Sequence, residues 1–80
     1  MEVNSELNEL VTPEEYRASR AHLFGSLHSL AWFIRTHKAE LNEVGAFRII
    51  AGRSLLHEGK ADEVVLRVSL MAARKLGAAA

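Results

Sequence analysis

A short run of strand-forming residues interrupts an otherwise helical pattern just past the middle of the chain. Ala46-Phe47-Arg48-Ile49-Ile50 is β-branched and aromatic, Ala51-Gly52-Arg53 supplies a turn, and Ser54-Leu55-Leu56-His57 has the composition of a returning strand. A two-stranded hairpin is marginally stable by itself in water, so it must pack on the helices around it. The sequence therefore predicts a small helical domain that carries one β-hairpin.

A strong helix start lies near the N-terminus. In Thr12-Pro13-Glu14-Glu15, threonine can accept hydrogen bonds from first-turn amides, proline suits the first helical position, and Glu15 can reach back to complete a capping box. We expect this helix to run from residue 13 to about residue 22. The residues before it, 1–11, are predicted to form a flexible acidic arm.

The next helical segment follows Phe24-Gly25-Ser26, where glycine permits a turn and serine can cap a helix. Apolar residues from Leu27 to Val44 keep the three- and four-residue spacing of one helical face. The pattern fits either one helix or two short helices with a break near Thr36-His37. Gly45 is placed to end the segment in the left-handed conformation.

A last helix is predicted from Ala61 to about Leu76, after a polar loop at 57–60. Its apolar stripe consists of Val64, Val65, Val68, Met71, Ala72 and Leu76. Charged residues occupy the opposite face, and Leu70 lies among them. Residues 77–80 are predicted to be a frayed tail.

Length and composition exclude several classes of protein. Eighty residues allow one domain and leave little room for an enclosed catalytic pocket. The chain has no cysteine for a disulfide framework, and its four histidines lack the spacing of a zinc-binding helix. The longest uncharged stretch, residues 21–34, is shorter than the roughly 20 apolar residues of a membrane span. We therefore expect a cytoplasmic protein that is not an enzyme, has no cofactor or metal and does not contact a membrane.

The zero net charge hides an asymmetry along the chain. Residues 1–16 contain five glutamates and no basic residue, whereas residues 17–60 contain seven arginines or lysines and three glutamates, a balance of +4. The middle of the chain could therefore face a phosphate backbone while the acidic start points away. An evenly solvated surface is the alternative interpretation.

Several short motifs then follow one another in order: Ser29-Leu30-Ala31-Trp32-Phe33-Ile34-Arg35, His37-Lys38, Gly45-Ala46 and Gly52-Arg53. Together they resemble the small excisionase-like and MerR-like winged-helix proteins of phages, plasmids and integrative elements, over roughly residues 12–70. The resemblance implies a mainly α fold, a winged helix-turn-helix domain at residues 12–76 with a two-stranded β-hairpin wing and a C-terminal helix. It also implies sequence-specific binding of double-stranded DNA. The function would be that of an excisionase-like recombination directionality factor with an integrase partner, or of a small transcription regulator.

In that family the helix that carries Ser-Leu-x-Trp enters the major groove. The resemblance therefore implies DNA contacts by four residues of this region, which are His28, Ser29, Arg35 and Lys38. Arginine can pair with guanine edges, and serine or lysine can bind a phosphate. The alternative for these residues is the solvent-exposed face of a helix. Of the neighbouring aromatic residues Trp32 and Phe33, we expect at least one to pack in the core.

Basic residues elsewhere extend the predicted DNA-binding surface. Arg48 and Arg53 lie on the hairpin, where a guanidinium can reach phosphates or the minor groove. Arg17 and Arg20 lie on the first helix, which crosses the DNA backbone in helix-turn-helix domains. Protection of a strand edge and surface solvation are the respective alternatives.

Two further interpretations concern proteins as partners. Leu66 and Leu70 on the last helix could allow self-association or cooperative binding, which a small DNA footprint would need. A non-catalytic protein-interaction module on a degenerate winged-helix fold is the alternative to DNA binding. The two functions differ in salt dependence, because phosphate contacts weaken steeply with added salt.

Overall fold

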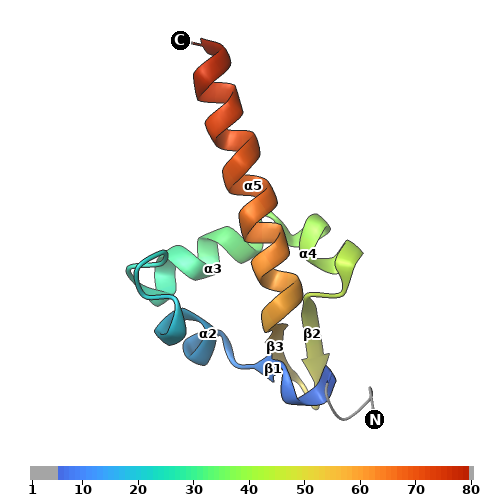
Figure 1. Ribbon diagram of the computed structural model, residues 1–80. Coiled ribbons are helices and arrows are strands. Elements are labelled where there is room, and N and C mark those ends of the chain that lie inside the picture. Colours follow the sequence, from blue (N-terminus) through green and yellow to red (C-terminus); the bar gives the residue numbers. More distant parts are fainter. Residues whose placement is uncertain (1–5, 80) are drawn as a thin grey trace.

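A computed structural model describes residues 6–79, with side chains to residue 77. Strand β1 (Leu10–Val11) leads into helices α2 (Pro13–Ser19), α3 (Leu27–Thr36) and α4 (Lys38–Val44). Strands β2 (Phe47–Ile50) and β3 (Arg53–His57) follow, and helix α5 (Glu58–Ala79) ends the chain. Figure 1 shows α5 crossing the remaining elements and then continuing well beyond them. The protein is therefore mainly helical, with one small sheet and a long C-terminal helix.

The first two predicted helix starts form as expected. The hydroxyl of Thr12 accepts the amide of Glu15 at 3.1 Å, and the carboxylate of Glu15 accepts the amide of Thr12 at 2.9 Å, which completes the capping box of α2. Ser26 and Ser29 form the same reciprocal pair at the start of α3. The break at His37 separates α3 from α4, so the middle segment is two short helices.

The hairpin is present, but it belongs to a three-stranded antiparallel sheet. The strand order is β1-β3-β2, with Phe47 opposite Leu56 and Ile50 opposite Arg53 in the hairpin. On the other edge of β3, Leu10 pairs with His57 and Val11 with Leu56. The hairpin prediction is confirmed, whereas the third strand is a feature that the sequence analysis did not identify.

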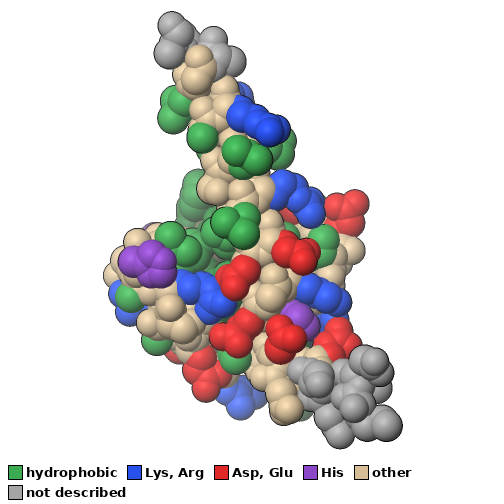
Figure 2. All heavy atoms as spheres, viewed as in Figure 1, with side chains coloured by type: hydrophobic (Ala, Val, Ile, Leu, Met, Phe, Trp, Pro, Cys, Tyr) green, Lys and Arg blue, Asp and Glu red, His purple; other side chains and the backbone are tan. Residues whose placement is uncertain are grey.

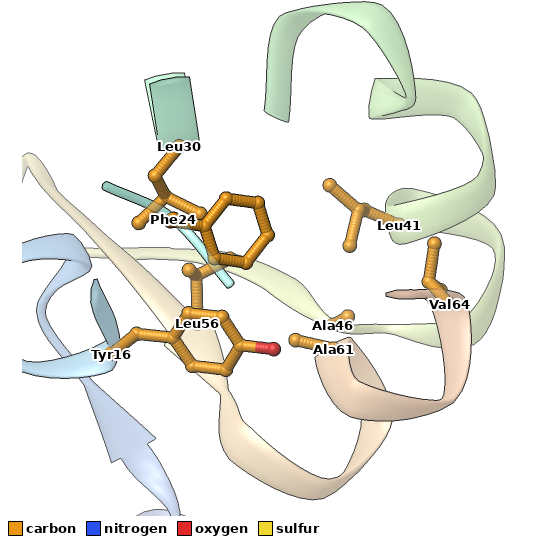
Figure 3. Close-up of a cluster of buried hydrophobic side chains, with 8 residues drawn as sticks. All are labelled: Tyr16, Phe24, Leu30, Leu41, Ala46, Leu56, Ala61 and Val64. Atoms are coloured by element: carbon orange, nitrogen blue, oxygen red, sulfur yellow. The ribbon is translucent and has the colours of Figure 1, made fainter. Parts of the chain in front are cut away.

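One core joins the helices to the sheet (Figure 3). Eight buried side chains form it: Tyr16, Phe24, Leu30, Leu41, Ala46, Leu56, Ala61 and Val64. Strands β1 and β2 supply none of these eight, but Val11 and Phe47 pack against them. Phe33 lies edge-on to Phe24, with 5.5 Å between the ring centroids. The core thus holds α3 and the hairpin against the same interior, which fixes their relative positions.

Both ends of the chain differ from the sequence-based expectation. Residues 6–11 are not a flexible arm, because residues 6–8 form a helical turn, Glu6 pairs with Arg48, and β1 joins the sheet. Residues 1–5 of the predicted arm lie outside the described residues. Residues 58–60 are the first turn of α5, not a loop, and the helix continues through the predicted tail to Ala79, while residue 80 is not described. The first helix ends at Ser19, short of residue 22.

Candidate nucleic-acid interface

One side of α3 is turned away from the core. Leu30, Phe33 and Ile34 pack inward, so the residues at the intervening positions of the helix, His28, Ala31, Trp32 and Arg35, are exposed. Residues 28, 32 and 35 are spaced by four and three positions, which places them in one row along a helix. The structure therefore presents a ring nitrogen, an indole and a guanidinium side by side on one accessible helix.

An open hollow continues this surface from α3 to the hairpin. It is bordered on the α3 side by Leu27, Ala31, Ile34 and Arg35, and on the opposite side by Pro13, Glu14, Lys38, Phe47 and Ser54. The ammonium group of Lys38 lies 5.2 Å from the centroid of the Phe47 ring, a cation–π contact that holds the charge at the edge of the hollow. Arg35 of the exposed row and Ser54 near the start of β3 therefore border the same hollow.

Arg53 stands at the first position of β3, directly after the hairpin turn. Ala51 and Gly52 both adopt positive φ, +52° and +78°, as the two central residues of a tight hairpin turn do. Neither Arg35 nor Arg53 forms an ion pair within the described part of the chain, and both are exposed. These two guanidinium groups are available to an external anion.

Arg48, the other hairpin arginine, is bonded to groups within the protein. Its Nε donates to the carbonyl of Gly45 at 2.6 Å, and its Nη2 donates to a carboxylate oxygen of Glu6 at 2.7 Å. The same contact and the nearby Lys60 lower the pKa of Glu6. Arg48 therefore holds the N-terminal turn and the α4–β2 connection together, and the structure gives it a role other than the predicted DNA contact.

Arg17 of α2 and Arg20, the residue that follows its last turn, likewise bond within the protein. Arg17 donates to the carbonyl of Phe24 at 3.0 Å and to that of Gly25 at 2.6 Å, so it braces the turn between α2 and α3. Arg20 lies 4.1 Å from the centroid of the Tyr16 ring and donates to both carboxylate oxygens of Asp62, each at 2.6 Å. Arg20 thereby ties α2 to α5.

Ser29 also has a local role. Its hydroxyl donates to the carbonyl of Ser26 at 2.8 Å and accepts the amide of Ser26 at 3.3 Å. Of the eight residues that the sequence analysis proposed, Arg35 and Lys38 line the hollow between α3 and the hairpin, while His28 on α3 and Arg53 at the hairpin turn are exposed outside it. The other four, Ser29, Arg48, Arg17 and Arg20, are engaged in contacts within the protein.

The sequence alone did not decide whether Trp32 is buried or exposed. The expectation that at least one residue of the pair 32–33 packs in the core is met by Phe33, whereas Trp32 is 55% exposed. A signal existed in the helical spacing, because residue 32 is four positions after His28 and three before Arg35. The indole therefore belongs with the two polar side chains on the outer row of α3.

Comparisons with protein-family models, curated proteins and solved structures find no match for this chain. Among residues 6–79, three or more His, Asp or Glu side chains nowhere gather as a metal site would require. No helix in the described part of the chain has the length and apolar character to cross a membrane. The site must therefore be interpreted from its own geometry.

Proposed function

We propose that the protein is a winged helix-turn-helix domain that binds double-stranded DNA in a sequence-specific manner and without catalysis. Helix α3 would enter the major groove, and the β2–β3 hairpin would act as the wing against the adjacent backbone. The observation that carries this proposal is that Arg35 and Lys38 line the hollow between α3 and the hairpin, while the exposed Arg53 follows the hairpin turn, one residue before Ser54 of the same hollow. The other arginines of the same region are bonded internally.

The dimensions and chemistry of this face support the proposal. A B-DNA major groove is about 12 Å wide and admits one α-helix. On α3, Arg35 would pair with a guanine edge, while Ala31 and Trp32 would make apolar contacts with thymine methyl groups. Arg53 at the turn would bind a phosphate or enter the minor groove. We place such a protein in the cytoplasm. It would act either as an excisionase-like recombination directionality factor with an integrase partner or as a small transcription regulator.

The single tryptophan of the chain provides the measurement, because it lies within the proposed interface. We would titrate the purified protein with a duplex from the region around its own gene and follow Trp32 emission at about 50 and about 200 mM salt. With two or three phosphate contacts, log K should fall with log salt at a slope of about −2 to −3. Unchanged emission and no binding at the lower salt concentration would refute the proposal.

Three variants test the assignment of residues. Arg35→Ala and Arg53→Ala should each weaken binding by about tenfold or more, the usual effect of removing one base or phosphate contact. Lys75→Ala is the matched control, because it removes one exposed positive charge from the far part of α5. An equal loss in Lys75→Ala would mean that net charge, and not the α3–hairpin face, determines the binding.

A protein-interaction module is the second candidate function. It is favoured by the exposed apolar side chains beside the same cations, Leu27 at 46% and Trp32 at 55% exposure. A protein partner that docks on these residues should bind with little salt dependence, since no phosphates are neutralised. Loss of that binding in Trp32→Ala but not in Arg53→Ala would establish this function in place of DNA binding.

A further inference from the structure

Helix α5 is much longer than the body that it packs on. Its first three turns contribute the buried Ala61 and Val64, whereas all of residues 69–77 are exposed. The radius of gyration is 13.5 Å and the longest dimension 46 Å, compared with a radius of about 12 Å expected for 80 residues in a compact domain. The second half of α5 therefore projects as a free helix, as Figure 1 shows.

The outward side of α5 carries a regular stripe. Its members recur at alternating intervals of four and three residues and are all exposed: Gly59, Glu63, Leu66, Leu70, Ala73 and Gly77. This is the heptad spacing along which two helices pack. At about 100° per residue, the stripe lies on the opposite side of the helix from the buried Val64. Leu66 and Leu70, at its centre, are 68% and 51% exposed.

Negative charge predominates at the start of α5 and positive charge in the rest of the helix. Glu58, Asp62 and Glu63 lie in its first two turns together with one base, Lys60, and the charges that follow are all basic: Arg67, Arg74 and Lys75. Figure 2 shows acidic side chains, with basic ones among them, around the lower part of α5, and basic and hydrophobic side chains above. A second α5 in parallel orientation would place like charges together, whereas an antiparallel one places acidic beside basic ends.

The stripe also fixes how two copies would align. With the two-fold axis between Leu66 and Leu70, Leu66 faces the partner's Leu70, and Glu63 lies level with the partner's Ala73. At the ends Gly59 and Gly77 are level, with the Glu9 carboxylate beside Gly59, where a Cβ would lie 3.1 Å from Oε1. Glu63 then lies beside the partner's Arg74, on the same flank of the helix pair. Neither Glu63 nor Arg74 forms an ion pair within residues 6–79, whereas Asp62 is already bound by Arg20. The alignment therefore pairs two free charges at each end.

We propose that α5 is the interface through which two copies of the chain form an antiparallel, two-fold symmetric dimer. The core of each body packs on the Val64 side of its own α5, so the two bodies lie on the outer sides of the helix pair. The overlap from residue 59 to residue 77 is about 27 Å long at 1.5 Å per residue. Such an interface is smaller than the roughly 1,600 Å² of a standard stable complex, so we expect a dissociation constant on the order of micromolar.

Charge reversal tests the alignment in the full-length protein by sedimentation equilibrium without nucleic acid, so the result does not depend on DNA binding. Glu63→Arg and Arg74→Glu should each weaken the dimer by about tenfold, because two symmetry-related attractions become repulsions. The double variant should recover most of the loss. Lys75→Glu, on the other side of the helix, should change little. A double variant as weak as the single ones, or a wild-type monomer at about millimolar concentration, would overturn the proposal.

Disulfide trapping tests the orientation, since the natural chain has no cysteine. Glu63→Cys and Ala73→Cys, introduced in separate chains and mixed under mild oxidation, should form the mixed disulfide, because the two positions lie level across the antiparallel pair. Preferential Ala73→Cys homodimers would show a parallel arrangement and refute this one. Leu66→Ser provides the apolar test and should remove dimerisation without loss of helix signal in circular dichroism.

Discussion

At the scale of single residues, three of the arginines proposed for DNA contact connect segments within the protein. Arg17, Arg20 and Arg48 each donate to two or more acceptors within the protein, so their guanidinium groups hold connections of the fold together. Their partners are as far as 42 positions away in the chain, which no local pattern can indicate. Arg35 and Arg53 look the same in the sequence but lack such partners in the described residues. The candidate site could be predicted as a region, but not resolved into free and committed cations.

Gly45 is the residue whose backbone most restricts substitution. It ends α4 with φ at +77°, and a Cβ there would lie 3.2 Å from Nη2 of Arg48. We expect Gly45→Ala to lower the free energy of unfolding by about 1–2 kcal/mol, from left-handed strain alone. Urea denaturation would measure this, with Gly25→Ala as the control, because a Cβ at Gly25 meets no atom within 4 Å. Equal destabilisation by both variants would contradict this account of Gly45.

At the scale of elements, the local signals predicted the starts of α2 and α3 and the hairpin, but not the long-range pairing of β1 or the start of α5. Thr12 and Ser26 cap helices as predicted, and the β-branched run forms the hairpin. Strand β1 is two residues long and forms only because β3 accepts it some 46 positions later. Helix α5 starts three residues before the expected Ala61, because Nδ1 of the buried His57 accepts a hydrogen bond from the amide of Lys60. The sequence Glu-Gly-Lys looks like a polar loop and gave no indication of this cap.

The contact between α2 and α5 makes the free energy of unfolding depend on pH in the acidic range. The guanidinium of Arg20 and the hydroxyl of Tyr16 hold the pKa of Asp62 below its ordinary value of 3.8. Because the unfolded chain takes up this proton first, the contribution is complete above about pH 5 and is lost as the pH falls through the folded pKa. Asp62→Asn should therefore flatten the decline of unfolding free energy between about pH 4.5 and 2.5.

Denaturant curves at several pH values measure this difference. Glu43→Gln is the matched control, because it removes an exposed carboxylate of α4 that forms no ion pair within residues 6–79. If Asp62→Asn and Glu43→Gln alter the acid limb equally, the α2–α5 contact is not the group that titrates.

At the scale of the whole molecule, the protein is a compact body with a projecting helix. We propose DNA binding for the body and dimerisation for the helix. The body presents α3 and the hairpin, while the projecting half of α5 buries nothing in the monomer. One copy offers few cations to a phosphate backbone, and a second copy would double the contacts at a repeated or palindromic site. Cooperative DNA binding would thus require both surfaces.

Removal of residues 73–80 separates the contributions of the two parts to stability. At low protein concentration the shortened chain and the full chain should unfold at nearly the same temperature, because the described side chains removed are all exposed. As the concentration rises, the midpoint of the full chain should increase, since a dimer of folded chains stabilises the folded state by mass action, while that of the shortened chain stays constant. Scanning calorimetry over a wide concentration range measures both. A shortened chain that melts far earlier at every concentration would show that the end of α5 supports the body itself, and parallel midpoints independent of concentration would show that it supports neither the body nor a dimer.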